Sequence, residues 1–178
     1  MMAAGTFIVA RLSGVISRLS TAGAVVSGIV FVGMTLLVLS EVVLRTFFST
    51  STLISGEYSG YALSAMVYLG LAFSFREGAH IRISFVRDRI HGIARFVLEI
   101  FCHLFVLVIC GLSSIYLWDM VRVSKMRNMT AYTVAETPLY VPQSIVFVGL
   151  CLLTIQIAAR LLHLVFSGPA ALEKESGP

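Results

Sequence analysis

Charge is scarce in this sequence. Only 12% of its 178 residues are charged, whereas 58% are hydrophobic, and the mean hydropathy is +0.94. Soluble domains carry about 25% charged residues, so this composition excludes an ordinary soluble protein. It indicates an integral membrane protein, and the length corresponds to a single domain, residues 1–178.

Cysteine is also rare, with three residues that all lie inside apolar runs. Cys102 and Cys110 stand eight positions apart. On one helix they would be separated by about 12 Å, which is too far for a disulfide. We therefore expect all three, including Cys151, to act as small packing residues of the core.

Motifs for chemistry are lacking as well. The sequence contains no zinc-ligand spacing, nucleotide-binding loop, Ser–His–Asp order or nucleic-acid motif, so we predict no enzyme, no metal and no cofactor. The pI near 9.2 does not indicate nucleic acid, because the basic residues flank apolar runs. Their expected neighbours are phospholipid headgroups.

Four long runs are nearly free of charge. A spanning helix needs about 20 apolar residues, and a segment in lipid must satisfy its own backbone hydrogen bonds as a helix. We predict an all-α membrane protein with four spans, near 19–44, 57–76, 96–118 and 140–163. The first run is uncharged from Leu19 to Ser40. It exceeds the roughly 7–15 residues of the hydrophobic region of a signal peptide, so we expect it to be retained.

Two features refine the segments between and after these runs. Pro138 and Pro142 suit the first turns of a helix, so the last helix should begin near Tyr140. Val86, Ile90 and Ile93 recur at helical spacing among charged residues, which predicts a short helix in the cytoplasmic headgroup layer. We expect the polar C-terminal segment, about 167–178, to be a disordered tail.

The basic residues are distributed unevenly between the two sides of the predicted spans. With a cytoplasmic N-terminus, nine of the 13 Lys and Arg residues fall inside, five of them between Arg76 and Arg95. The remaining four fall outside: Arg45, Arg122, Lys125 and Arg127. Because short cytoplasmic loops carry the excess of Lys and Arg, both termini are predicted to be cytoplasmic.

Ionisable residues at the span ends form two pairs at i, i+4 spacing. Glu41 and Arg45 suit a helix ion pair, with a role in coupling or partner contact as the alternative. Glu99 and His103 favour a buried pair or a contact to another subunit, with a proton relay as the alternative. Ser55 is a candidate N-cap of the second helix, followed by Glu57 in the first turn.

Small residues recur four positions apart in two runs. Gly56, Gly60 and Ser64 would share one face of the second helix, and Gly23 and Ser27 one face of the first. Such faces permit close helix–helix approach in lipid. The pattern predicts packing without naming the partner.

Histidines supply an alternative function. His80, His103 and His163 all fall toward the predicted cytoplasmic side. Two histidines can hold a b-type haem between helices, which would make the chain a haem-bearing membrane anchor of a respiratory oxidoreductase. A simpler interpretation places His80 in a charged loop and His163 at a helix end.

The segment SGEYSGYALSAMVYLGLAFSFREGAHIRISFVRDRI resembles the small membrane subunit of the tripartite ATP-independent periplasmic (TRAP) transporters. The matching positions are Glu57 at the start of the second helix, Gly70 midway, and the turn formed by Arg76, Gly78 and His80, followed by Arg82. Arg45 and Pro142 also match. The family often has a tryptophan shortly before the helix-two acid, whereas this chain reads STLIS.

The resemblance implies a division of labour. A periplasmic binding protein captures an organic anion or similar solute and contacts the complex transiently. A large membrane subunit, in a stable heterodimer with the small one, moves the solute by a sodium-driven elevator motion. The small subunit of the bacterial inner membrane would then scaffold the large one and bind no substrate. The residues expected to contact the partner subunit or lipid headgroups are Arg45, Glu57, Gly60, Arg76, His80 and Arg82.

Overall fold

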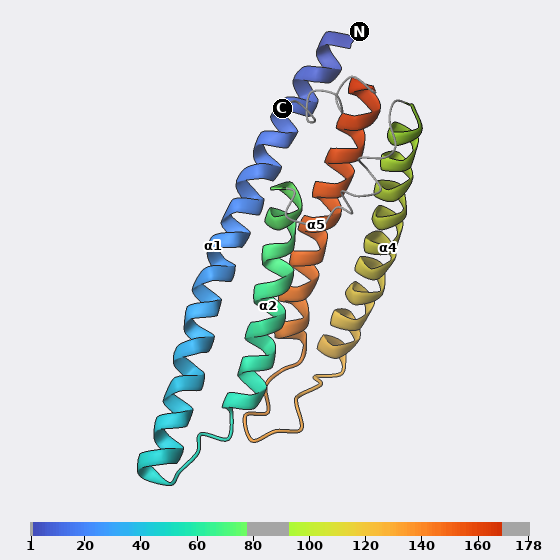
Figure 1. Ribbon diagram of the computed structural model, residues 1–178. Helices are drawn as coiled ribbons and strands as arrows, with labels where there is room; N and C mark the ends of the chain where they lie inside the picture. The colour runs from blue at the N-terminus through green and yellow to red at the C-terminus, as the bar shows by residue number, and fades with distance from the viewer. Residues whose placement is uncertain (1, 78–92, 169–178) are drawn as a thin grey trace.

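The computed structural model describes residues 2–77 and 93–168, which form four long helices (Figure 1). They are α1 (Met2–Phe48), α2 (Ser55–Arg76), α4 (Ile93–Met126) and α5 (Tyr140–Ser167). Within these ranges no strand occurs, and Thr130 and Pro138 form an isolated β-bridge. The predicted all-α fold is confirmed for this part of the chain.

The helices form an open row. α1 packs on α2, α2 packs on α5, and α5 packs on α4, while α1 also contacts α5. Figure 1 shows that α2 and α5 run in the same direction, opposite to α1 and α4. The two central helices therefore have neighbours on both sides, whereas the described residues leave one broad face of α1 and of α4 uncovered.

In the described part of the chain, three helices are long and apolar enough to cross a membrane, over Ile16–Phe48, Ile93–Met126 and Tyr140–Phe166. α2 forms where the second span was predicted, and its 22 residues are sufficient in length. It is less apolar than the other three, because serine and tyrosine interrupt its sequence. Length and composition thus support three of the four predicted spans. For the second predicted span, α2, the structure supports the helix alone.

Two helices extend beyond the charge-free runs used to predict them. α1 begins at Met2, and α4 continues past Asp119 to Met126. In this last part of α4, Val121 and Ser124 are buried while Asp119 and Arg122 are exposed. Charges on the outer faces do not end a helix whose inner face still packs.

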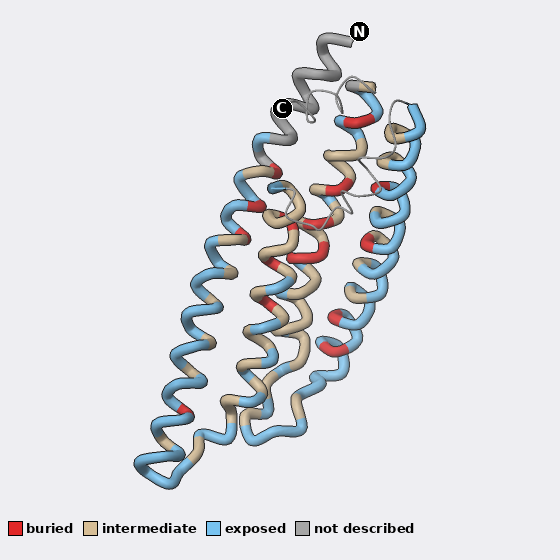
Figure 2. The backbone as a smooth tube through the Cα atoms, viewed as in Figure 1, coloured by how far each residue is buried: buried red, intermediate tan, exposed pale blue. Residues whose placement is uncertain are grey.

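The buried core lies where α2, α5 and α4 meet (Figure 2). It comprises Ala72, Cys110, Leu150, Leu153 and Ile157. Cys110 is buried as predicted, but Cys102 is exposed on α4, so the core assignment was wrong for Cys102. All three cysteines are free.

The outer faces of α1 and α4 are covered with exposed leucine, valine, isoleucine and phenylalanine side chains. Exposed apolar areas of this extent do not occur on water-soluble monomers. These faces suit lipid tails or an apolar protein surface.

Helix starts were predicted with mixed success. α5 begins at Tyr140, as the two prolines indicated. Ser55 was wrongly predicted to cap α2, because it is the first helical residue, and the preceding Ile54 makes no side-chain capping bond. Other predictions fall outside the described residues. These are most of the predicted interfacial helix, the residues His80 and Arg82, and the C-terminal tail beyond residue 168.

Candidate functional site

Helices α1 and α2 approach closely through small residues. The Ser27 hydroxyl donates a hydrogen bond of 2.7 Å to the Met66 carbonyl oxygen. A Cβ atom added to Gly23 would lie 2.9 Å from the Leu69 carbonyl oxygen, and one added to Gly70 would lie 3.3 Å from Ser27 Oγ. The face of Gly23 and Ser27 therefore packs as the sequence predicted, and its partner is α2.

Helices α2 and α5 are closer still at Gly149. A Cβ atom there would lie 2.6 Å from the backbone carbonyl of Tyr68, nearer than real Cβ contacts. Sequence reasoning missed Gly149, because no second small residue marks it as part of a spaced pair. Its only sequence signal is a glycine inside an uncharged run.

Polar side chains also join the helices. The fully buried Ser20 of α1 donates a hydrogen bond of 3.3 Å to Gln156 Oε1 of α5. On the opposite side of α5, the hydroxyls of Thr154 and Ser114 lie 3.4 Å apart. Ser20 thus bonds to a neighbouring helix, whereas Ser114 and Thr154 donate at 2.8 Å to carbonyl oxygens of their own helices, Cys110 O and Leu150 O. These bonds avoid the cost of leaving the hydroxyls unpaired in an apolar environment.

Arg76 fastens the end of α2 to α1. Its Nη1 donates to the Ser17 carbonyl oxygen at 2.8 Å, to the Ser17 hydroxyl, and to Thr21 Oγ1 at 3.1 Å. Its Nη2 pairs with Glu77 Oε1 at 2.8 Å, and the guanidinium lies 4.8 Å from the centroid of the Phe73 ring. The Arg76 side chain therefore makes contacts within the chain that hold α2 to α1, and it is not a free cation on the surface. We term these contacts the Arg76 latch.

At the opposite end of α1, Glu41 organises the turn into α2. Its carboxylate accepts hydrogen bonds from Arg45 Nε at 2.7 Å, from the Ser51 hydroxyl, and from both the amide (3.1 Å) and the hydroxyl of Thr52. The predicted Glu41–Arg45 pair is confirmed. The bonds to the turn extend its role, because they hold a segment in which Ser49 and Leu53 adopt positive φ angles.

Glu57 joins the start of α2 to the loop between α4 and α5, residues 127–139, which we term the α4–α5 loop. The Thr133 hydroxyl donates to Glu57 Oε2, and the Thr137 hydroxyl lies 3.4 Å from the Tyr58 hydroxyl. The sequence analysis assigned Glu57 to the helix terminus and to a contact with the partner subunit or lipid headgroups, not to a contact within this chain. It missed Thr133 and Thr137, since nothing in the sequence brings residues 76 positions apart together.

Glu99 and His103 form the predicted buried pair on α4. His103 Nδ1 lies 2.7 Å from the Glu99 carbonyl oxygen and 3.6 Å from its carboxylate. The His103 ring meets the Phe75 ring of α2 edge-on, with centroids 5.9 Å apart. The His103 imidazole thus has its hydrogen-bond partner within α4, and its ring packs against α2.

Gly60 contrasts with the packed glycines. Neither Gly60 nor Gly56 has any atom within 4 Å of an added Cβ, so this face of α2 is not covered by the described part of the chain. Leu63 and Val67 continue the same exposed side. The small-residue pattern was the same as in α1, but here it faces outward.

Comparison with protein families identifies the family of this chain. The model of the DctQ component of the tripartite ATP-independent periplasmic transporters matches residues 34–167. The chain belongs to this family. No curated protein sequence matches it. The match covers the end of α1 and all of α2, α4 and α5, so this TRAP component is the small membrane subunit of its transport system.

The residues that resemble the family motif have a common role in this TRAP component. Glu57 contacts the α4–α5 loop, Gly70 admits Ser27 of α1, and Arg76 binds Ser17 of α1. Each lies on α2 and each contacts another element of the same chain. Within the described residues, the motif thus fixes α2 against its surroundings.

Proposed function

We propose that this chain is the static scaffold subunit of a sodium-coupled TRAP transporter for an organic anion or similar solute, and that it binds no substrate itself. Its family membership is the observation that carries the proposal. Family membership also favours this function over a haem-bearing anchor. The large membrane subunit would move the solute, delivered by the periplasmic binding protein.

The contacts between helices support a static role. The polar side chains of Ser20, Ser27 and Arg76 are bonded to neighbouring helices, and Gly23 and Gly149 hold backbones in direct contact. Elements packed this closely tolerate little change without strain. A rigid row of helices is suited to hold a moving partner in place.

We further propose that all four helices cross the bacterial inner membrane with both termini in the cytoplasm. α2 lies between α1 and α5 and, with 22 residues, is about 33 Å long, enough for a hydrocarbon core of about 30 Å. Its lower hydropathy fits a helix that is mostly covered by protein. The distribution of Lys and Arg supports the orientation.

The uncovered face at Gly60 is the proposed contact for the large subunit. Gly60→Leu would place a branched side chain where a partner helix is proposed to approach, at a position where an added Cβ meets no atom of the described residues within 4 Å. We expect a lower yield of the large subunit in affinity co-purification from membranes. Gly111→Leu on α4, which also has open space around it, serves as the matched control and should leave the yield unchanged.

A co-purification yield unaffected by Gly60→Leu would contradict the assignment of this face. Failure of the wild-type chain to co-purify with any large membrane subunit would contradict the proposed function itself.

A further inference from the structure

Among the four described helices, α2 is the least suited by composition to enter a membrane alone. The other three contain a stretch that is long and apolar enough to cross, whereas α2 has the length without the apolarity. Serine and tyrosine recur along it, and Glu57 and Arg76 stand in its first and last turns. Because apolarity sets how readily a helix enters the bilayer, composition gives α2 the weakest drive to insert.

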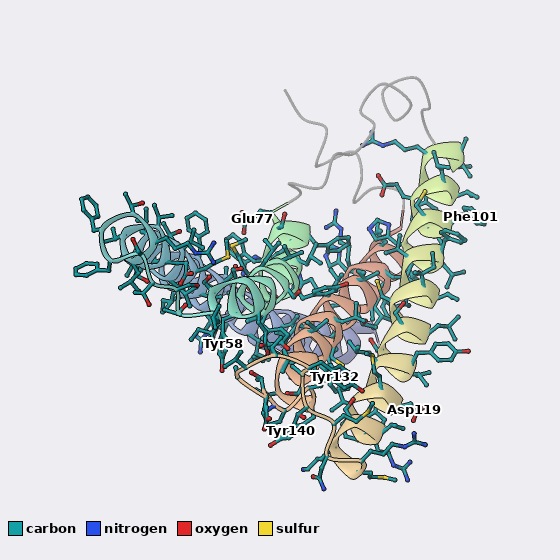
Figure 3. All side chains as sticks on the ribbon, turned by 90° about the horizontal axis from the view of Figure 1, so that it is seen from below. Tyr58, Glu77, Phe101, Asp119, Tyr132 and Tyr140 are labelled. Carbon is teal, nitrogen blue, oxygen red and sulfur yellow. The ribbon has the colours of Figure 1, made fainter. Side chains whose placement is uncertain are left out.

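Contacts with α1 can supply what the composition of α2 lacks. Figure 3 shows the two helices side by side, seen from the end at which the turn between them lies. Ser27 Oγ donates to Met66 O at 2.7 Å, and a Cβ atom added to Gly23 would lie 2.9 Å from Leu69 O. Close backbone approach and interhelical hydrogen bonds hold helices together in lipid, where apolar surface alone does not.

The two helices are also joined at both ends. At one end, the Arg76 latch holds the last turn of α2 to Ser17 and Thr21 of α1. At the other end, the Glu41 carboxylate of α1 accepts hydrogen bonds from the amide and hydroxyl of Thr52, just before α2 begins. The contacts therefore extend over the whole length of α2.

α1 does not depend on α2 in the same way. Its apolar stretch, Ile16–Phe48, is long enough to cross by itself. On the side away from α2 it exposes large apolar side chains such as Val25, Ile29 and Leu36. α1 is thus stable in lipid before α2 packs on it.

The order of the chain makes α1 the first surface that α2 meets. The other neighbour of α2 is α5, which touches the Tyr68 backbone at Gly149, but α5 follows α4 in the sequence. Chains are synthesised from the N-terminus, so α1 is complete when α2 emerges and α5 is not.

We propose that α1 is the surface on which α2 enters the membrane, and that the two helices insert as a hairpin through the face of Gly23 and Ser27. This inference rests on the proposed topology, in which α2 crosses the membrane. It gives α1 a role in the assembly of the subunit that is separate from transport.

The test uses the full chain, expressed in bacterial cells without the large subunit, with an enzyme active only in the periplasm inserted after Glu77. If α2 crosses, the enzyme lies in the cytoplasm and is inactive. Gly23→Leu leaves α2 unchanged, but its Cβ would collide with Leu69 O. We expect the enzyme activity per membrane-bound chain to rise at least about threefold, as for loss of one interhelical contact in lipid.

Gly28→Leu is the matched control, because it raises the apolarity of α1 equally at a position where an added Cβ meets no atom within 4 Å. It should leave the activity at the wild-type level. Ser27→Val, which removes the hydroxyl donor to Met66 O, should act in the same direction as Gly23→Leu. It keeps the test decisive if the Gly23→Leu chain is degraded.

A second substitution separates insertion from packing. Gly60→Leu makes α2 itself more apolar at a position with open space around it, and the absent large subunit plays no part in the result. Added to Gly23→Leu, it should return the enzyme activity toward the wild-type level, because a more apolar α2 no longer needs α1 to insert.

Three results would overturn the inference: no rise with Gly23→Leu and Ser27→Val, an equal rise with Gly28→Leu, or no return with Gly60→Leu. In each of these the wild-type enzyme remains inactive, so the proposed topology and function stand. An active enzyme in the wild-type chain would instead show that α2 does not cross, and would contradict the proposed topology itself.

Discussion

At the scale of single residues, the absence of a side chain decides where this molecule packs. Gly23, Gly70 and Gly149 lie against the backbone or a side chain of a neighbouring helix, whereas Gly60 and Gly111 face open space. The two kinds of glycine cannot be distinguished by spacing, because the sequence specifies which residues share a face but not what that face meets. The prediction that Gly23 and Ser27 form a packing face was correct, but the sequence did not say that the face packs on α2.

Gly149 gives a direct test of this packing. Gly149→Ala would bring Cβ to 2.6 Å from the Tyr68 backbone and force α2 and α5 apart. We expect a loss of stability of about 1–3 kcal/mol, as for other overpacked interiors. The measurement is the thermal unfolding midpoint of the purified protein in detergent, with Gly111→Ala as the control that should change it little. Equal midpoints for the two variants would refute the close approach.

At the scale of elements, the helices were predictable and their contacts were not. Apolar runs, together with Pro138 and Pro142 at the start of the last one, indicated all four described helices, because length and hydropathy are local properties. The contact of Thr133 with Glu57 and the latch from Arg76 to Ser17 join residues far apart in the chain. They depend on the order of helices in the row, which no local pattern encodes.

The Arg76 latch can be tested by substitution of Arg76. Arg76→Ala removes the bonds from α2 to Ser17 and Thr21 of α1 and leaves their oxygens without this donor. We expect less assembled transporter and a lower uptake rate, with the relative preference among solutes unchanged. Arg18→Ala, at an exposed arginine of the adjacent turn, is the control. Normal assembly and uptake with Arg76→Ala would show that the latch is dispensable.

At the scale of the whole molecule, the chain is a row of helices with apolar outer faces and polar contacts within. Glu41 fixes the turn between α1 and α2, and Glu57 fixes the α4–α5 loop at the same end. Arg76 fixes the other end of α2. Both ends of α2 are thereby held to other elements of the chain, in keeping with the proposed scaffold function.

The orientation in the membrane is tested by a reporter fused after Pro178. An enzyme that is active only in the periplasm should give no signal there, because the excess of Lys and Arg on one side predicts that both termini are cytoplasmic. The same reporter inserted in the α4–α5 loop after Glu136 should be active. A strong signal from the C-terminal fusion would contradict the orientation.

The central claim is that this subunit supports transport without contacting the solute. The most direct measurement is uptake by reconstituted complexes in the presence of a series of competing solutes, for the wild type and for Gly60→Leu and Arg76→Ala. We predict that these substitutions lower the uptake rate but leave the ranking of the competing solutes unchanged. A changed ranking with any of them would mean that this chain lines the path of the solute, and would contradict the scaffold function.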